Sequence, residues 1–404
     1  MTAALDVVGD YLAEHETGLV AFRRMLHAHP ERSGEEHATT EAVAERLLLA
    51  GLSPVTLRSG TGLVCDVVGG PGPVVVLRAD IDALAMPDLS TTPYRSQVPG
   101  LAHACGHDVH TAVVLGAGLA LARLAASGAL AGTVRLVFEP SEEEVPGGAV
   151  EVVESGHLDG VSGVFGLHCD PKTDVGLIGV RPGALTSASD RVEIVLRGPG
   201  GHTARPERTV DLVRLAATVV HELPPMLDAH FGSHGDLRLV FGAVHGGEAA
   251  NVIPSEIALA GSLRTQRREA WDAAERTLRA CLGRLVDGTG AQWHLVHTRG
   301  VPPVVNDEAA TAVLASAARD VLDADAVVPT EHSWGGDSFA WYLDRAPGSY
   351  ARLGVHDPRS TGPRLDLHAS TFDVDERAIG VGVRVLVATA LRWLAHVREL
   401  TAAD

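Results

Sequence analysis

Three short apolar runs, each followed at once by acidic or imidazole side chains, constrain this chain more than any other feature. The runs are Val74–Leu77, Val134–Phe138 and Val161–Leu167. Segments with helical spacing of apolar residues separate them, notably Thr111–Ala126, and this alternation predicts an α/β fold with a parallel sheet buried on both faces. Because ligands of such sheets gather beyond the carboxyl ends of the strands, we expect the polar residues after the runs to meet in one site.

The length and the changes of pattern predict two domains. A chain of 404 residues exceeds one ordinary domain. Residues 184–300 are expected to form a small inserted α+β domain, with elements at Val192–Leu196, Thr209–Leu223, Arg238–Val244, Ile257–Ser262 and Glu269–Val286. Residues 1–183 and 301–404 would form the larger, discontinuous α/β domain, with helices at Leu12–Met25, Ala42–Leu49 and from about Asp375 to Val397.

Charge and cysteine content restrict the partners and the compartment. The formal net charge of −18 argues against nucleic acid and anionic membranes, which demand basic patches. The 4 cysteines are too few for a disulfide framework. The N-terminus shows no secretory pattern, and no uninterrupted apolar run is long enough to span a bilayer. A cytoplasmic protein is therefore expected.

The run from His103 to His110 places a thiol and several imidazoles in one loop before a helix. Cys105 and His107 flank a glycine that lets the backbone turn so that both side chains face one point. A thiolate and an imidazole are preferred ligands of zinc and similar ions. The alternative is a buried cysteine beside residues that cap the helix.

Carboxylates follow the other apolar runs. Adjacent acids such as Glu142 and Glu143 can divide their work, one holding a metal while the other takes a proton from metal-bound water. Asp82 follows the first run and His368 lies in a turn before the last helix. Acidic runs are usually solvated, and Asp82 could merely cap the next segment. Together, however, the donors exceed the needs of one tetrahedral ion and suit a pair of ions.

These motifs resemble the M20 metallopeptidase family, in its amidohydrolase branch of hippurate hydrolases, auxin-conjugate hydrolases and N-acyl amino acid deacylases. The resemblance covers nearly the whole chain. Its motifs are Leu26–Glu31, Arg78–Leu84, His103–Asp108, Pro140–Glu143, Gly200–Pro206, Asn251–Pro254 and His368. It implies a parallel-sheet metallohydrolase domain with an inserted α+β domain for dimerisation and closure.

The resemblance also implies roles for individual residues. Two divalent ions (zinc, manganese, cobalt or nickel) would be held by Cys105, His107, Glu143, His168 and His368. Glu142 would be the general base, Asp82 would support the ligands, and His202 would polarise the scissile carbonyl, from the partner subunit of a homodimer. The residues that would contact substrate are Asn251, Arg264, Gly335 and Gly336.

The chain departs from the family pattern at three places. Gly335–Phe339 reads Gly-Gly-Asp-Ser-Phe where the family commonly has Gly-Ser-Glu-Asp-Phe, so Gly336, Asp337 and Ser338 replace serine, glutamate and aspartate in a stretch that lines the substrate pocket in the family. Glu139 replaces a glutamine and adds negative charge near the predicted ions. Cys169, after His168, is also unusual and is interpreted as a buried structural thiol.

Hydrolysis of N-acyl amino acids or related small amides is the function that the sequence favours. The alternatives are a dipeptidase of the same fold, a hydrolase with Cys105 as nucleophile, and a non-catalytic metal- or ligand-binding protein. A dipeptidase needs a site for the α-amino group of its substrate, for which no motif is evident. A metal-binding protein without activity has no use for Glu142 beside the ligands.

Overall fold

The computed structural model describes residues 2–231 and 236–403, which form two compact units. The first unit comprises Met1–Gly183, Val305–His332 and Ser338–Asp404. The second comprises Ala184–Val304 together with Ser333–Asp337. The sequence placed the end of the insertion at residue 300 and assigned the 333–337 segment to the larger domain. The 333–337 segment belongs instead to the second unit, where it bonds to the residues just before β8 (Ser189–Arg197): Ser187 N donates to the carbonyl of Gly335 at 3.0 Å.

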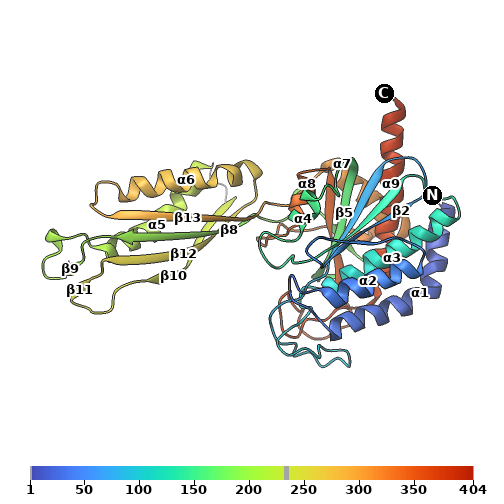
Figure 1. The fold of residues 1–404 in the computed structure, drawn as a ribbon, viewed down its shortest axis with the longest axis horizontal. Coiled ribbons are helices and arrows are strands. Elements are labelled where there is room, and N and C mark those ends of the chain that lie inside the picture. Colours follow the sequence, from blue (N-terminus) through green and yellow to red (C-terminus); the bar gives the residue numbers. More distant parts are fainter. Residues whose placement is uncertain (1, 232–235, 404) are drawn as a thin grey trace. The chain divides into compact units, whose positions relative to one another are not determined.

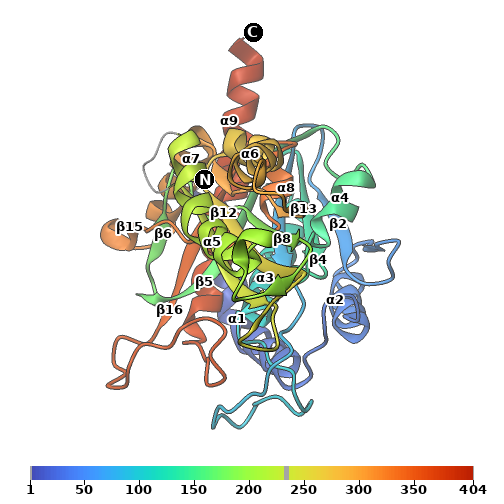
Figure 2. The same cartoon turned by 90° about the vertical axis from the view of Figure 1, so that its left-hand side faces the viewer.

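An eight-stranded sheet forms the centre of the first unit, in the order β1-β2-β4-β3-β5-β16-β6-β15. The labels in Figure 2 follow this order from β15 on the left to β2 on the right. The bounds are β1 Val55–Thr56, β2 Leu63–Val68, β3 Val74–Asp80, β4 Thr133–Glu139, β5 Val161–Asp174, β6 Ile178–Val180, β15 Val327–Pro329 and β16 Gly348–His356.

The expected parallel sheet is present at the middle of this sheet, and the sheet as a whole is mixed. Strands β4, β3, β5 and β16 are mutually parallel, whereas β2 runs antiparallel to β4 and β6 antiparallel to β16. The central strands consist largely of buried Val, Leu and Ala, as parallel strands covered on both faces require. Strand β5 extends beyond the expected Leu167, so His168 lies within the strand rather than after it.

The helices of the first unit are α1 Thr2–Ala28, α2 His37–Leu49, α3 His107–Ala126, α4 Ala149–Glu154, α7 Glu308–Val321, α8 Ala340–Leu343 and α9 Arg377–Ala403. Helices α1, α3 and α9 pack on one another, and α3 and α9 also pack on β3. Gly118 allows α3 to approach β4 closely, since a Cβ there would lie 2.2 Å from a methyl carbon of Leu136.

Two helices are long and apolar enough to cross a membrane, α3 and α9, which differs from the sequence-based expectation. Most of each apolar window is buried inside the unit. Their apolar character follows from packing against β3 and against each other. Such helices are typical of the core of a water-soluble domain as well as of a membrane span.

The second unit is a four-stranded antiparallel sheet, in the order β10-β12-β8-β13, with helices α5 and α6 packed on one face (Figure 1). The bounds are β8 Ser189–Arg197, α5 Leu212–His230, β10 Leu237–His245, β12 Glu256–Thr265, α6 Arg268–Val286 and β13 Gln292–Val301. A separate pair of short strands, β9 Gly201–His202 and β11 Val252–Ile253, lies outside this sheet.

Helix α5 begins and ends later than the expected Thr209–Leu223. The side chain of Asp211 accepts a hydrogen bond from Arg214 N at 3.1 Å, so the cap sits at Asp211. The helix continues through Pro224 and Pro225 to His230. Buried Leu223 and Leu227 lie on its apolar face, and this packing offsets the cost of the prolines.

A buried arginine links three helices of the first unit. Arg23 of α1 is fully buried, and its Nε donates to Asp108 of α3 at 2.6 Å. Its other nitrogens lie 3.3 Å from Glu376 and 3.4 Å from Asp373, just before α9. Burial raises the pKa of Asp108, but the charge of Arg23 together with the charge and hydrogen bond of His27 outweighs it, so the pKa lies well below its usual range. The pair therefore holds the first turn of α3 in place.

Replacing Arg23 by methionine should lower the free energy of unfolding by about 3–5 kcal/mol, because it removes the guanidinium that compensates the buried charge of Asp108. Arg24→Met is the matched control. Arg24 also pairs with Glu376 but is exposed, and its loss should cost about 1 kcal/mol or less. Urea unfolding measures both, and equal effects of the two substitutions would contradict this account.

Candidate metal centre

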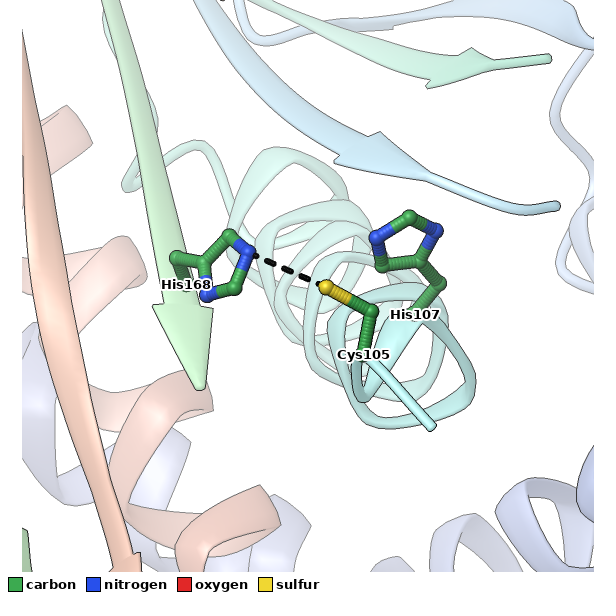
Figure 3. A group of neighbouring side chains, drawn as sticks. All are labelled: Cys105, His107 and His168. Atoms are coloured by element: carbon green, nitrogen blue, oxygen red, sulfur yellow. Dashed lines mark hydrogen bonds between the residues drawn. The ribbon is translucent and has the colours of Figure 1, made fainter. Parts of the chain in front are cut away.

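The carboxyl end of the parallel strands carries the residues that the sequence singled out. Cys105 lies in the loop before α3, His107 is the first residue of that helix, and His168 lies on β5 (Figure 3). The Cys105 Sγ is 3.6 Å from His168 Nε2 and points between the two imidazoles. All three residues are buried, and one ligand atom from each lies within 4.8 Å of the others.

Two further groups of metal-type donors overlap with the first. Cys105, Glu143 and His368 form one, and His107, Glu142 and Glu143 form the other. In each group the donor atoms lie within 4.8 Å of one another. The structure therefore brings together all the residues predicted as ligands, with Glu142 beside them.

Unusual backbone conformations make this convergence possible. Gly106, between Cys105 and His107, has a φ of 86°, which favours glycine. A Cβ at Gly106 would lie 2.7 Å from Cys169 Sγ. His368 has a φ of 61°, rare for a non-glycine residue, and its backbone N donates to Ala104 O at 2.8 Å. This bond joins the turn that carries His368 to the loop that carries Cys105.

The carboxylate of Asp82 orients two of the predicted ligands. His107 Nδ1 lies 3.1 Å from Asp82 Oδ1 and 3.0 Å from the Asp82 carbonyl, so Nδ1 carries the proton. Asp82 Oδ2 accepts from the backbone N of Glu143 at 2.9 Å and from Ser33 Oγ at 2.6 Å. Burial raises the pKa of Asp82, but the hydrogen bond and charge of His107 outweigh it, so the pKa lies below its usual value.

The side chains present fit a bound metal. His107 Nε2 is buried and has no hydrogen-bond partner among the described residues. His168 Nδ1 donates to the Cys169 carbonyl at 2.7 Å, which leaves its Nε2 lone pair toward Cys105. Because each Nδ1 is engaged by an acceptor, each imidazole can offer its Nε2 to a metal beside a thiol and a carboxylate, the donor set of zinc and related ions. Because the donor groups overlap, they suit a pair of ions.

Asp80, His107 and His110 form a further group of possible donors, but the ring of His110 is already engaged. Its Nδ1 donates to Asp80 Oδ1 at 2.5 Å, and its Nε2 accepts from the backbone N of Cys169 at 2.8 Å. Burial raises the pKa of Asp80, but the charges of Arg78 and both histidines hold it well below its usual range. We therefore assign Asp80 and His110 to the support of the ligands.

Glu142, the predicted general base, is partly buried, and its Oε1 accepts from the backbone N of Ser338 at 3.2 Å. The Ser338 Oγ in turn donates to Glu139. Two of the departures from the family pattern, at positions 139 and 338, are thus in direct contact. The third, Cys169, is buried under Gly106 and belongs to none of the donor groups found among the described residues.

The remaining predicted site residues belong to the second unit. His202 on β9 is exposed, and its Nδ1 accepts from the backbone N of Ala204 at 3.0 Å. Asn251 is its neighbour, because its carbonyl accepts from Thr203 N at 3.2 Å. Arg264 is half-buried and donates to Ser262 Oγ and to the Trp334 carbonyl.

Gly335 and Gly336 are exposed and lie beside the strands of the second unit. A Cβ at Gly336 would lie 2.7 Å from a methyl carbon of Val301 and 2.9 Å from Ser189 Cβ. This position therefore excludes the serine of the family pattern unless its neighbours move.

Several residues that support the site were not predicted. Ser33 bonds to Asp82, and Glu36 Oε1 accepts from the backbone N of Ser141 at 2.7 Å, which fixes the turn before Glu142. No local motif marks them, because their partners lie far away in the chain. His103 is buried but belongs to none of the donor groups found in the described ranges.

Comparison with known proteins identifies the family. Residues 76–392 match the model of peptidase family M20/M25/M40. The chain belongs to this family. It is 34% identical over 396 residues to an N-acetyl-L-cysteine deacetylase of Bacillus subtilis, covering 97% of this chain and 92% of that protein. The chain is 32% identical to the B. subtilis YXEP protein, described as a dinuclear metal-binding peptidase of family M20. The two structures match with a TM-score of 0.81 over 95% of this chain and 99% of the other.

One M20 relative is a longer protein. A Rhodococcus jostii protein named as a candidate glutamate–cysteine ligase 2-3 is 44% identical over 373 residues. The match covers 92% of this chain and 46% of that protein, so the chain spans about half the length of this relative.

We expect the protein, loaded with metal and desalted, to hold about two divalent ions per subunit. Cys105→Ala and His107→Ala should each lose at least one, because each residue belongs to more than one donor group. Cys281→Ala, in the apolar core of the second unit, serves as the matched control and should keep both ions. Plasma mass spectrometry measures the content. Full occupancy in His107→Ala would show that the ions bind elsewhere.

Proposed function

We propose that this M20 protein hydrolyses the amide bond of N-acyl amino acids or related small amides. The observation that carries the proposal is the group formed by His107, Glu142 and Glu143. Glu143 also belongs to a second donor group with Cys105 and His368, whereas Glu142 belongs to this group alone. A carboxylate next to the ligands and not needed among them suits proton transfer. The relative named as an N-acetyl-L-cysteine deacetylase supports the acyl amino acid class.

Divalent ions, when bound by the five ligand residues, supply a water nucleophile at neutral pH and polarise the scissile carbonyl. Glu142 accepts the proton of the attacking water and then delivers it to the departing nitrogen. The backbone N–H of Ser338 holds the Oε1 atom of Glu142 during both transfers. Asp82 keeps the His107 ring in one tautomer, so that its Nε2 stays a ligand.

His202 and Arg264 are proposed to bind the substrate. Because His202 Nδ1 accepts a hydrogen bond from Ala204, its neutral ring carries the proton on Nε2. That N–H can donate to the oxygen anion that develops during attack. Arg264 offers a planar fork of donors for the substrate carboxylate, with Asn251, Gly335 and Gly336 completing the contacts.

Glu142→Gln should lower kcat by about 10²–10⁴-fold while the metal content stays unchanged. Glu144→Gln is the matched control, because Glu144 is exposed and belongs to none of the donor groups of the described residues. The assay is release of amino acid from N-acetyl, N-benzoyl and indole-acyl substrates and from dipeptides, with chelator and with zinc, manganese, cobalt or nickel. The metal that restores the highest activity after chelation would identify the preferred ion.

Each outcome of this assay is informative. Chelator-sensitive release from one acyl series supports the proposal and defines the pocket. Cleavage confined to dipeptides would favour a dipeptidase. Turnover retained in Glu142→Gln would remove Glu142 as the base, and activity that depends on the Cys105 thiol without metal would favour a cysteine nucleophile.

We also propose a homodimer in which His202 acts on the site of the partner subunit. Support comes from β10, which is an edge strand with exposed Val240 and Val244. Such an edge can pair with another chain. A cytoplasmic location is proposed as well, and the four buried, free thiols of the described chain agree with a reducing compartment.

Subunit mixing tests the role in trans. His202→Ala and Glu142→Gln homodimers should each be nearly inactive. After random reassociation, half of the dimers are mixed and each of these has one complete site, which gives about a quarter of the wild-type activity. If His202 acts within its own subunit, or if sedimentation shows only monomers, mixing recovers nothing.

A further inference from the structure

A buried chain of hydrogen bonds leads from Glu142 into the first unit. The bond from Ser338 N to Glu142 Oε1, 3.2 Å long, is its first link. Ser338 is fully buried, whereas Glu142 is only partly buried. The position of this backbone N–H depends on what holds the Ser338 side chain, since the residue begins a turn that leads into α8.

Both hydrogen-bonding capacities of the Ser338 hydroxyl are used. It donates to Glu139 Oε1 and accepts from Arg78 at 2.9 Å. Arg78 is itself fixed, because its Nε donates to Glu139 Oε2 at 2.6 Å and another nitrogen donates to Asp80 at 2.6 Å. A buried hydroxyl that both donates and accepts a hydrogen bond has a single orientation. The backbone of the same residue is therefore held in place as well.

Glu139 bonds both to Ala149, which follows Glu142 in the chain, and to Ser338, whose backbone donates to Glu142. Its Oε1 accepts from the backbone N of Ala149 at 2.9 Å as well as from Ser338. Gly147 packs against the same serine, since a Cβ at Gly147 would lie 2.6 Å from Ser338 Cβ. Glu139 therefore fixes the loop that carries Glu142 and the segment that donates to it.

The charges of this cluster surround one guanidinium. Arg78, Asp80 and Glu139 are all buried, so Arg78 serves two carboxylates. The cluster also contains the two contacting departures from the family pattern. A carboxylate stands at position 139 and a hydroxyl at 338, where the pattern has an amide and a carboxylate.

We propose that Ser338, held by Glu139 and Arg78, is a positioning residue for Glu142. The proposal rests on the proposed function, in which Glu142 transfers the proton. In this proposal Glu139 and Ser338 orient the carboxylate of Glu142, and neither residue contacts the substrate. The double change Glu139→Gln/Ser338→Asp moves the carboxylate from position 139 to position 338. An acid then still lies beside Arg78, and the glutamine amide can donate to that acid, so the orientation of Glu142 should be preserved.

Kinetics of four variants test the proposal. Ser338→Ala keeps the backbone N–H but removes the hydroxyl that Glu139 and Arg78 hold. It should lower kcat about tenfold, the size of one hydrogen bond to a charged group, with KM changed less than about twofold and metal content unchanged. Ser338→Asp alone should lower it further, because two buried carboxylates then adjoin. The double variant should recover most of kcat. Ser349→Ala, which removes a buried hydroxyl bonded to Thr311 at 3.0 Å, is the control and should keep the wild-type kcat.

Crystal structures of wild type, Ser338→Ala and the double variant provide a readout that needs no activity. Glu142 should be displaced or spread over several conformers in Ser338→Ala and return to one conformer in the double variant. An unchanged Glu142 in Ser338→Ala, or a double variant no better than Ser338→Asp, would overturn the proposal. If wild type hydrolyses no amide, the proposed function fails, and these structures still decide whether Ser338 positions Glu142.

Discussion

The site depends above all on the hydrogen bonds of one buried carboxylate. One oxygen of Asp82 accepts a hydrogen bond from His107, and the other accepts from Ser33 and from the backbone N of Glu143. The ring of His107, at the start of α3, and the backbone of Glu143 are thereby held by one side chain. Because ionised Asp82 is an acceptor only, His107 must carry a proton on Nδ1, and its Nε2 is the atom that can serve as a metal ligand.

Much of this arrangement could be predicted from the sequence, because strand topology does most of the positioning. Apolar runs ending in Asp80 and Glu139 lie side by side in register on parallel strands, so their polar ends had to meet. The loop with Cys105 and His107 was recognisable from its residue types and its glycine. The domain insertion was visible in the sequence, because the regular alternation of strands and helices changes there to the pattern of a small α+β domain. The short 333–337 segment gave no such signal.

The unpredicted part consists of contacts between residues that are distant in the chain. Ser338 reaches Glu142 and Glu139, about two hundred positions earlier, and periodicity carries no information about such pairs. The sequence analysis made no prediction for the side chains of Arg23 and Arg78, yet both are buried and each pairs with two or more carboxylates. Departures from a family pattern were visible one by one, and only the fold shows that Glu139 and Ser338 form a pair.

A crystal of the protein grown with a divalent ion, with diffraction measured at the absorption edge of that ion, would locate the metal sites. We expect two anomalous peaks about 3.5–4 Å apart, both within ligand distance of the group formed by Cys105, His107, Glu143, His168 and His368. Glu142 should lie beside the peaks without ligating either. A single peak, a peak between Asp80 and His110, or Glu142 bound directly to an ion would contradict this expectation.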